Sequence, residues 1–402
     1  MSDSSTALSP VLQFRQNLQA KLRDGVRRAI ETVLEEELLA ALGADAHVRT
    51  SERRGYRHGT TERTVTTHDG TRTITVPRAR LQTEAGPATE FHSAVLPRYA
   101  RRIREVDDAL LGCYFGGVNS RRIRRALQPL LGEAHLSKSA VSRVVARVKQ
   151  QFVVWQQRPL TDERYAVVFL DGIHLRVRLA GRVVVVPVLV ALGVTNTGQK
   201  QLLALHLAVA EATASWGGLL ADLQRRGLPA PMLVVTDGHA GLKNALEAWP
   251  MVRVQRCTAH KGRNLDDACP VHARPELRRD DHRLLYAKDG LAARAAYDAF
   301  LKKWTTLCPP VARSLEEAGL DLLTFYTFPK ATWKSLRTTN ALENLHREFR
   351  RRTKTQASFS TEAAALTVLF GLVAAGQIVF RKIDGHQDLA AFLVQEQWCQ
   401  AA

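Results

Sequence analysis

Two aspartates in apolar surroundings are the residues of this chain whose types and positions are most suited to chemistry. Asp171 lies inside the apolar run 169–173, and Asp237 directly follows the β-prone run 233–236. A carboxylate inside an apolar strand is costly to bury unless it is paired or binds a cation. Ligands and catalytic groups collect at the carboxyl ends of strands in open α/β sheets. Both aspartates are therefore candidate metal ligands; the alternatives are a water-exposed edge position for Asp171 and a helix cap for Asp237.

A third acidic candidate, Glu343, lies on a helix expected over residues 340–352. Glu343, Arg347 and Arg350 fall on one face of this helix, apart from its apolar face. A carboxylate among arginines suits a site where a metal ion and a phosphate meet. The alternative is structural, because Asn340-x-x-Glu343 is close to a capping box at the start of the helix.

These three acids together predict metal-dependent phosphoryl transfer. Three carboxylates can hold two Mg²⁺ ions about 4 Å apart, one activating the attacking oxygen and the other stabilising the leaving oxygen. Mg²⁺ prefers oxygen ligands and keeps several waters, so few protein ligands suffice. We therefore expect two Mg²⁺ ions at Asp171, Asp237 and Glu343, with Mn²⁺ as a substitute.

The elements that position these acids follow from the apolar pattern. Strands are expected over residues 166–178, 183–194, 201–209, 233–236 and 253–256, and helices over residues 216–226 and 242–249. The order β-β-β-α-β-α-β is that of a ribonuclease H-like core, an α/β fold with a mixed sheet flanked by helices. Such a core places carboxylates on its first strand, at the end of its fourth strand and on a later helix.

The rest of the chain is expected to bind DNA and to complete this core. A helix is expected over residues 12–42, a strand over residues 71–76 that stops at Pro77, and two helices over residues 120–127 and 137–147 that fit a helix-turn-helix. The expected segments are an N-terminal helical region with a candidate dimerisation face (1–50), a basic Arg-rich DNA-contacting segment (51–104), a helix-turn-helix-like DNA-binding region (105–158), the first part of the catalytic core (159–264), a helical insertion (265–330), and the rest of the core with the helix of Glu343 and C-terminal helices (331–402).

The net charge and the cysteine content indicate which kind of partner the protein binds and in which cellular compartment it works. A net charge of +18 favours a polyanion such as nucleic acid, with an anionic membrane surface as the alternative. Five cysteines, an odd number and widely spaced, indicate a reducing, cytosolic compartment. The uncharged stretch 363–380 is expected to be a buried helix, with a membrane-spanning helix as the alternative.

Arginine is suited to phosphate contacts because its planar fork is always charged. A solvated basic surface is the alternative reading. The residues predicted to bind DNA are Arg54, Arg57, Arg78, Arg80, Arg121, Arg122, Lys138, Arg143, Arg337, Asn340, Arg347, Arg350, Arg351, Arg352 and Lys354.

Four segments carry a resemblance to a known family. They are Arg54-Gly-Tyr-Arg-His-Gly59 with Val76-Pro-Arg-Ala-Arg80; Leu170-Asp-Gly-Ile-His-Leu-Arg-Val-Arg178; Val235-Thr-Asp-Gly-His-Ala-Gly-Leu242 running on to Gln255-Arg-Cys-Thr-Ala-His-Lys-Gly-Arg-Asn264; and Arg337-Thr-Thr-Asn-Ala-Leu-Glu343 with Phe349-Arg-Arg-Arg-Thr-Lys354. In this order, over most of the chain, they resemble the mutator-type bacterial insertion-sequence transposase family. The sequence departs from the family's usual residues at His58, His174 and Leu175, where we expect altered contacts.

The resemblance implies a DDE transposase whose acids are Asp171, Asp237 and Glu343. The stretch of sequence between Asp237 and Glu343 is longer than that between Asp171 and Asp237, and this longer stretch fits the family's helical insertion before the glutamate. The implied partners are double-stranded DNA, as the element's terminal inverted repeats and as target DNA, and further copies of the chain in a dimer or larger assembly. A bacterial cytoplasmic, nucleoid-associated location and a copy-type route through circular DNA are also implied.

Cys257-x-x-His260 matches a Cys/His motif of this family, and a structural role near the site is carried over. With Cys269-x-x-His272 it mimics a zinc site. Zinc is not expected, because the linker between the pairs is short and the second pair is outside the family pattern. The sequence has no phosphate-binding loop of the Walker type, so no use of ATP is expected, and no membrane partner either.

Two other functions remain compatible with these residues. A structure-specific endonuclease on the same fold would cut strands without joining them. A domesticated DNA-binding regulator would bind DNA without catalysis, although the full set of three acids argues against it.

Overall fold

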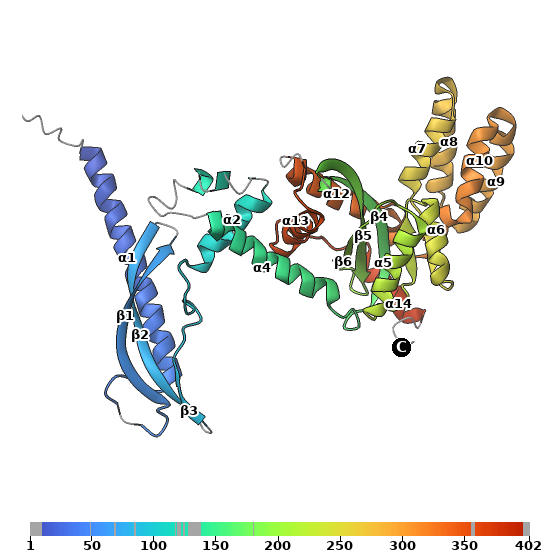
Figure 1. Ribbon diagram of the computed structural model, residues 1–402. Coiled ribbons are helices and arrows are strands. Elements are labelled where there is room, and N and C mark those ends of the chain that lie inside the picture. Colours follow the sequence, from blue (N-terminus) through green and yellow to red (C-terminus); the bar gives the residue numbers. More distant parts are fainter. Residues whose placement is uncertain are drawn as a thin grey trace, which may run out of the picture. The chain divides into compact units, whose positions relative to one another are not determined.

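The computed structural model describes residues 10–48, 50–67, 70–83, 86–116, 118, 122–123, 125–127, 138–179, 181–354 and 358–396. The chain divides into two compact units, residues 1–145 and 146–402. The first unit holds an antiparallel sheet with helices, and the second holds a larger mixed sheet with most of the helices (Figure 1).

The first unit begins with a long helix that packs on a three-stranded antiparallel sheet. These elements are α1 (Pro10–Leu42), β1 (Gly55–Thr67), β2 (Gly70–Thr83) and β3 (Gly86–Glu90). Leu34 of the helix is fully buried in one cluster with Ile74, and Leu38 is fully buried in another with Ala79. The C-terminal part of the apolar stripe that predicts the helix therefore covers the sheet, whereas Leu18 and Leu22 nearer its beginning are exposed.

Strand β2 continues through Pro77, so the expectation that the strand stops there is wrong. Pro77 lies opposite Thr60 of β1, and the register of the two strands shifts between Arg57 and Thr60. Proline has no N–H to donate and is tolerated in sheets at such irregularities. Strands β1 and β3 are not predicted by the apolar pattern, because most of their residues are exposed.

Helices α2 (Arg104–Phe115) and α4 (Lys138–Gln157) follow this sheet. Leu110 of α2 is buried in one cluster with Val144 of α4. Within the helix expected over residues 120–127, the described residues 122–123 and 125–127 are helical. The turn to the next helix lies outside the described residues, so the helix-turn-helix stays a prediction. The second expected helix is present and extends beyond Arg147 to Gln157.

The second unit is organised around a five-stranded mixed sheet with the order β6-β5-β4-β7-β8. Its elements are β4 (Tyr165–Leu179), β5 (Arg182–Thr195), β6 (Lys200–Leu207), α5 (Thr213–Arg225), β7 (Leu233–Thr236), α6 (Ala240–Ala245) and β8 (Arg253–Arg256). Strands β4, β5 and β6 pair antiparallel, β7 runs parallel to β4, and β8 runs parallel to β7. The expected element order and the mixed α/β class are confirmed.

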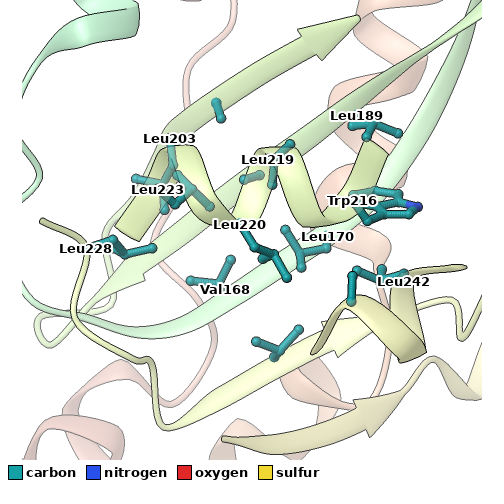
Figure 2. Packing of buried hydrophobic residues seen from close by; sticks show 14 of the residues in the cluster. Val168, Leu170, Leu189, Leu203, Trp216, Leu219, Leu220, Leu223, Leu228 and Leu242 are labelled. Carbon is teal, nitrogen blue, oxygen red and sulfur yellow. The ribbon is translucent and has the colours of Figure 1, made fainter. Parts of the chain in front are cut away.

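Helices cover both faces of this sheet, which explains the long apolar runs of its strands. On one face, Trp216, Leu219 and Leu223 of α5 pack with Val168 and Leu170 of β4 (Figure 2). Helices α12 and α13 also pack against β4. Because successive side chains of a strand point to opposite faces, Asp171 points away from the side covered by α5.

Beyond β8 the chain is mainly helical. The helices are α7 (Thr258–Ala268), α8 (Arg274–Leu285), α9 (Gly290–Leu307), α10 (Pro309–Ala318), α11 (Trp333–Leu336), α12 (Asn340–Thr353), α13 (Glu362–Ala374) and α14 (His386–Gln395). The helix expected to reach residue 380 ends at Ala374, and Gly376 follows in a left-handed conformation with φ of 66°. Within the described ranges, no helix is long and apolar enough to cross a bilayer.

Candidate active site

The register of the core sheet places the two aspartates beside each other. Strand β7 runs parallel to β4, and its last residue, Thr236, pairs with Leu170. The next residue along each chain segment is an aspartate, Asp171 in β4 and Asp237 after β7. Both residues therefore border the space past the carboxyl end of β7, where ligands of α/β sheets bind.

Asp171 is a buried carboxylate close to the charge of Asp237. Its Oδ1 accepts a 2.9 Å hydrogen bond from the N–H of Gly172, and its Oδ2 lies 3.6 Å from Nδ1 of His346. Burial and the negative charge of Asp237 raise the pKa of Asp171 to about 7. Burial lowers the pKa of His346 to about 3, so this histidine is neutral near pH 7 and does not balance the charge. A buried carboxylate beside a second carboxylate is suited to a bound cation.

Asp237 sits in a turn that a glycine makes possible. Gly238 has a φ of 82°, and a Cβ at this position would overlap the guanidinium of Arg256. Arg256 donates through Nε to the carbonyl of Asp237 at 3.0 Å and is itself held by both oxygens of Glu317, at 2.7 and 3.0 Å. The N-cap of α6 is His239, so the helix-cap alternative for Asp237 is wrong.

Glu343 lies in the first turn of α12, the helix that packs on β4. Its Oε1 accepts a 2.7 Å hydrogen bond from Nη2 of Arg263, and Nε2 of His260 lies 3.7 Å away. The N-cap of α12 is Thr339, and no side chain caps the helix start, so the capping-box alternative is wrong. The carboxylate therefore faces basic groups of α7 and not its own helix start.

Cys257 and His260 join the beginning of α7 to the beginning of α12. The Sγ of Cys257 accepts 3.3 Å hydrogen bonds from both the N–H and the hydroxyl of Thr339. Burial alone would raise the pKa of the Cys257 thiol, but hydrogen bonds from His260 and Thr339 hold that pKa below its usual value. Hydrogen bonding to Cys257 in turn raises the pKa of His260. These contacts fix the residue directly before the helix of Glu343, which is a geometric basis for the predicted structural role.

The donor set fits a hard divalent cation by its chemistry. All three acids offer carboxylate oxygens, which Mg²⁺ and Mn²⁺ prefer, and burial together with the charge of Asp237 disfavours the charged form of Asp171, which a bound cation would offset. In the described part of the chain, no group of three or more His, Cys, Asp or Glu side chains is already arranged to hold a metal ion.

The residues predicted to contact DNA differ in whether their side chains already bond to other side chains of the protein. The exposed ones that have no hydrogen-bond or carboxylate partner among the described side chains are Arg54, Arg80, Asn340, Arg350 and Lys354. Those bonded to neighbours are Arg57 to Glu35, Arg78 to Glu90, Arg337 to Tyr286, Arg347 to Asn344, and Arg351 and Arg352 to Glu348. Arg122 and Arg143 are exposed, whereas Arg121 and the side chain of Lys138 lie outside the described residues.

Two residues in contact with the acids are not singled out by the sequence pattern. His346 contacts Asp171, and Arg263 bonds to Glu343. A signal for both exists in the sequence, because each lies three residues after a predicted site residue on a helix, which is the spacing of neighbours on one face.

Two aspartates at adjacent positions of parallel strands, with a glutamate on a helix that packs on one of those strands, define a class: α/β proteins with a carboxylate site. The chain matches the model of the family described as "Transposase, Mutator family" over residues 3–378, and it belongs to that family.

Individual relatives agree with this assignment. The transposase for insertion sequence element IS406 of Burkholderia multivorans is 35% identical over 361 residues, 87% of this chain and 90% of the relative. The transposase for IS905 of Lactococcus lactis is 32% identical over 366 residues, 90% of this chain and 91% of the relative. The transposase for IS1081 of Mycobacterium tuberculosis is 34% identical over 363 residues, 90% of this chain and 86% of the relative.

Proposed function

We propose that this chain is the transposase of an insertion sequence, with a ribonuclease H-like core that cleaves and joins DNA strands by DDE chemistry. The observation that carries this proposal is the position of Asp171 and Asp237 at adjacent points of two parallel strands, with Glu343 on a helix that packs on one of them. The sheet order and the relatives named as insertion-sequence transposases support it.

Asp171, Asp237 and Glu343 would hold two Mg²⁺ ions, with Mn²⁺ as a substitute. When bound, such ions activate an attacking oxygen and stabilise a leaving oxygen of a phosphodiester. The chain's own residues position the carboxylates: Arg256 fixes the turn of Asp237, and Cys257 fixes the start of α12 through Thr339.

The proposed reaction has two displacements at phosphorus. A water molecule first frees a 3′-OH at the end of the element, and this 3′-OH then attacks a second phosphodiester. No covalent bond between protein and DNA is needed. The basic first unit would bind the terminal inverted repeats, with affinity mainly from phosphate contacts and specificity from base edges. Two DNA ends must be brought together, so self-association is part of the proposal.

Metal-dependent cleavage of the element end tests this function. A labelled duplex with the terminal inverted repeat would be incubated with the wild type and Asp171→Ala, in Mg²⁺ and in EDTA. We expect cleavage only by the wild type in Mg²⁺, with a loss of at least about a thousandfold in the variant. Asp267→Ala, which removes an exposed acid of α7, should cleave normally. Equal cleavage by Asp171→Ala, or cleavage in EDTA, would contradict the proposal.

A further inference from the structure

A fourth carboxylate, that of Glu211, lies against the strand that carries Asp171. Glu211 stands between β6 and α5. A Cβ added to Gly172 would lie 2.8 Å from Cδ of Glu211, and a Cβ added to Gly241 would lie 2.7 Å from its backbone oxygen. Two glycines therefore leave room for this glutamate, one for its side chain and one for its backbone.

Both glycines belong to the segments that carry the proposed acids. Gly172 directly follows Asp171 in β4, and Gly241 lies in α6, just after the turn of Asp237. Strand β7 ends at Thr236, so it does not cover β4 beside Gly172. Glu211 therefore reaches the same open end of β7 as the two aspartates, but from the side of α5. Its negative charge contributes to the raised pKa of Asp171.

The Glu211 carboxylate has little to balance it. Its side chain is 17% exposed, and its ionic partner is His174, whose Nε2 lies 3.7 Å away on a side chain that is 56% exposed. In the described part of the protein, no hydrogen-bond donor contacts this carboxylate. An exposed, distant pair of this kind contributes little. Two neighbouring carboxylates without a cation repel each other at a cost in free energy.

A buried histidine beside Asp171 is a second, independent sign of an unfilled site. The side chain of His346 is 4% exposed, and its Nε2 is buried without a hydrogen-bond partner in the described structure. Its Nδ1 lies 3.6 Å from Asp171. A polar atom this deeply buried without a partner is costly, and it belongs to the residue that contacts Asp171.

We propose that Glu211 is a fourth carboxylate ligand of the divalent metal centre and binds a Mg²⁺ or Mn²⁺ ion together with Asp171 and Asp237. This inference rests on the function proposed above. It extends the site to the α5 side of the sheet, so that carboxylates approach the ion from both faces of β4. The competing role is structural: an ion pair with His174 that holds the 208–212 segment in place.

Binding of Mn²⁺ alone to the full chain tests the proposal without any DNA or activity. Affinity and stoichiometry would be measured by calorimetry and by Mn²⁺ paramagnetic resonance for the wild type, Glu211→Gln, Asp171→Asn and Glu247→Gln. Glu247 is an exposed glutamate of the same unit and serves as the matched control. We expect Glu211→Gln to weaken Mn²⁺ binding by about ten- to a hundredfold, and Glu247→Gln to bind as the wild type.

Thermal unfolding without metal separates a ligand from a structural ion pair. If Glu211 is a ligand, Glu211→Gln relieves repulsion, so the metal-free melting temperature is unchanged or higher and the Mn²⁺-induced increase shrinks. If the pair with His174 is its role, the metal-free melting temperature falls and Mn²⁺ binding is unchanged, which overturns the inference.

The Asp171→Asn variant separates this inference from the function beneath it. Loss of Mn²⁺ binding in Asp171→Asn with normal binding in Glu211→Gln would overturn the role of Glu211 alone. Normal binding in Asp171→Asn would instead overturn the metal centre itself. Weakened binding in both, with Glu247→Gln unchanged, supports both.

Discussion

Each aspartate of the site is followed by a glycine, and the two glycines do different work. Gly172 leaves room beside Asp171 for the carboxylate of Glu211. Gly238 takes up a left-handed conformation and leaves room for Arg256, which bonds to the carbonyl of Asp237. The absence of a side chain after each acid is therefore what lets distant residues approach it.

Replacing Gly238 with alanine should be far more harmful than the backbone conformation alone explains. The new Cβ would meet the guanidinium of Arg256, which Glu317 holds in place. We expect a loss of about 2–3 kcal/mol in the free energy of unfolding, together with a loss of strand cleavage because Asp237 shifts.

The matched control for this substitution is Gly181→Ala. Gly181 has a φ of 81°, almost the same as Gly238, but no atom lies within 4 Å of an added Cβ. It should cost only about 1 kcal/mol, measured by urea unfolding, and leave cleavage intact. Equal costs for the two variants would show that contact with Arg256 is unimportant.

At the scale of elements, burial decides which parts of the fold could be predicted from the sequence. Strands β4 and β5 are buried on both faces over most of their length and are rich in apolar and β-branched residues, so their bounds were predictable to within one residue at each end. Strands β1 and β3 are mostly exposed and rich in polar residues, so no apolar pattern reveals them. Strand β2 continues through Pro77 because the register of β1 shifts opposite this proline. That shift arises from the pairing of the two strands, so the local sequence around Pro77 does not reveal it.

The residues of the site also divide into those that the local sequence predicts and those that only the folded structure brings together. The positions of Asp171 and Asp237 follow from strand ends and could be predicted. Glu211 could not, because it reaches Gly172 only after elements far apart in sequence have packed together. For Arg263 the helical spacing from His260 places it on the face of a predicted site residue but does not show that it bonds to Glu343.

One of the contacts between the sheet and the helical segment after it is an ionic cluster, and this cluster predicts a pH effect. Glu317 of α10 pairs with Arg256 of β8 and with Lys261 of α7, both of them buried. Although burial would raise it, hydrogen bonds from Arg256 and Lys261 lower the pKa of Glu317 to about 2. A carboxylate whose folded pKa is depressed contributes stability above its usual pKa of 4.5 and loses it as the pH falls toward 2.

The Glu317 side chain is 52% exposed, so solvent screens its ion pairs. Glu317→Gln should therefore cost only about 1 kcal/mol at pH 7, and this difference from the wild type should shrink steadily below about pH 4.5. Urea unfolding between pH 7 and pH 2.5 measures it. The neighbouring exposed glutamate gives the control, Glu316→Gln, which should differ little from the wild type at any pH. A cost for Glu317→Gln that stays constant with pH would rule out the ionic account.

At the scale of the whole molecule, the chain carries an excess of positive charge, which favours binding to DNA. The net charge is +18, and much of the arginine on the first unit is already paired with carboxylates, as Arg57 is with Glu35 and Arg78 with Glu90. Among the first unit's arginines predicted to contact DNA, Arg54 and Arg80 are exposed and have no such partner among the described residues, so affinity for DNA should depend on them.

Replacing Arg54 and Arg80 together with alanine should weaken binding to any duplex and reduce its salt dependence. Each lost phosphate contact lowers the slope of log K against log salt by about 0.9, so the double variant should lose about 2. Arg57→Ala with Arg78→Ala removes the same charge from paired positions and should change the slope less. Fluorescence anisotropy at several salt concentrations measures both, and equal slopes for the two double variants would contradict the assignment.

The most direct measurement of the central claim is strand transfer in vitro. Purified protein, Mg²⁺ and labelled element ends would be compared with Asp171→Ala, Asp237→Ala and Glu343→Ala, each first shown to bind the ends as the wild type does. The account predicts joined products from the wild type and none from any of the three variants. Joining that survives the loss of any one acid would contradict it, and cleavage without joining by the wild type would make the protein a nuclease instead.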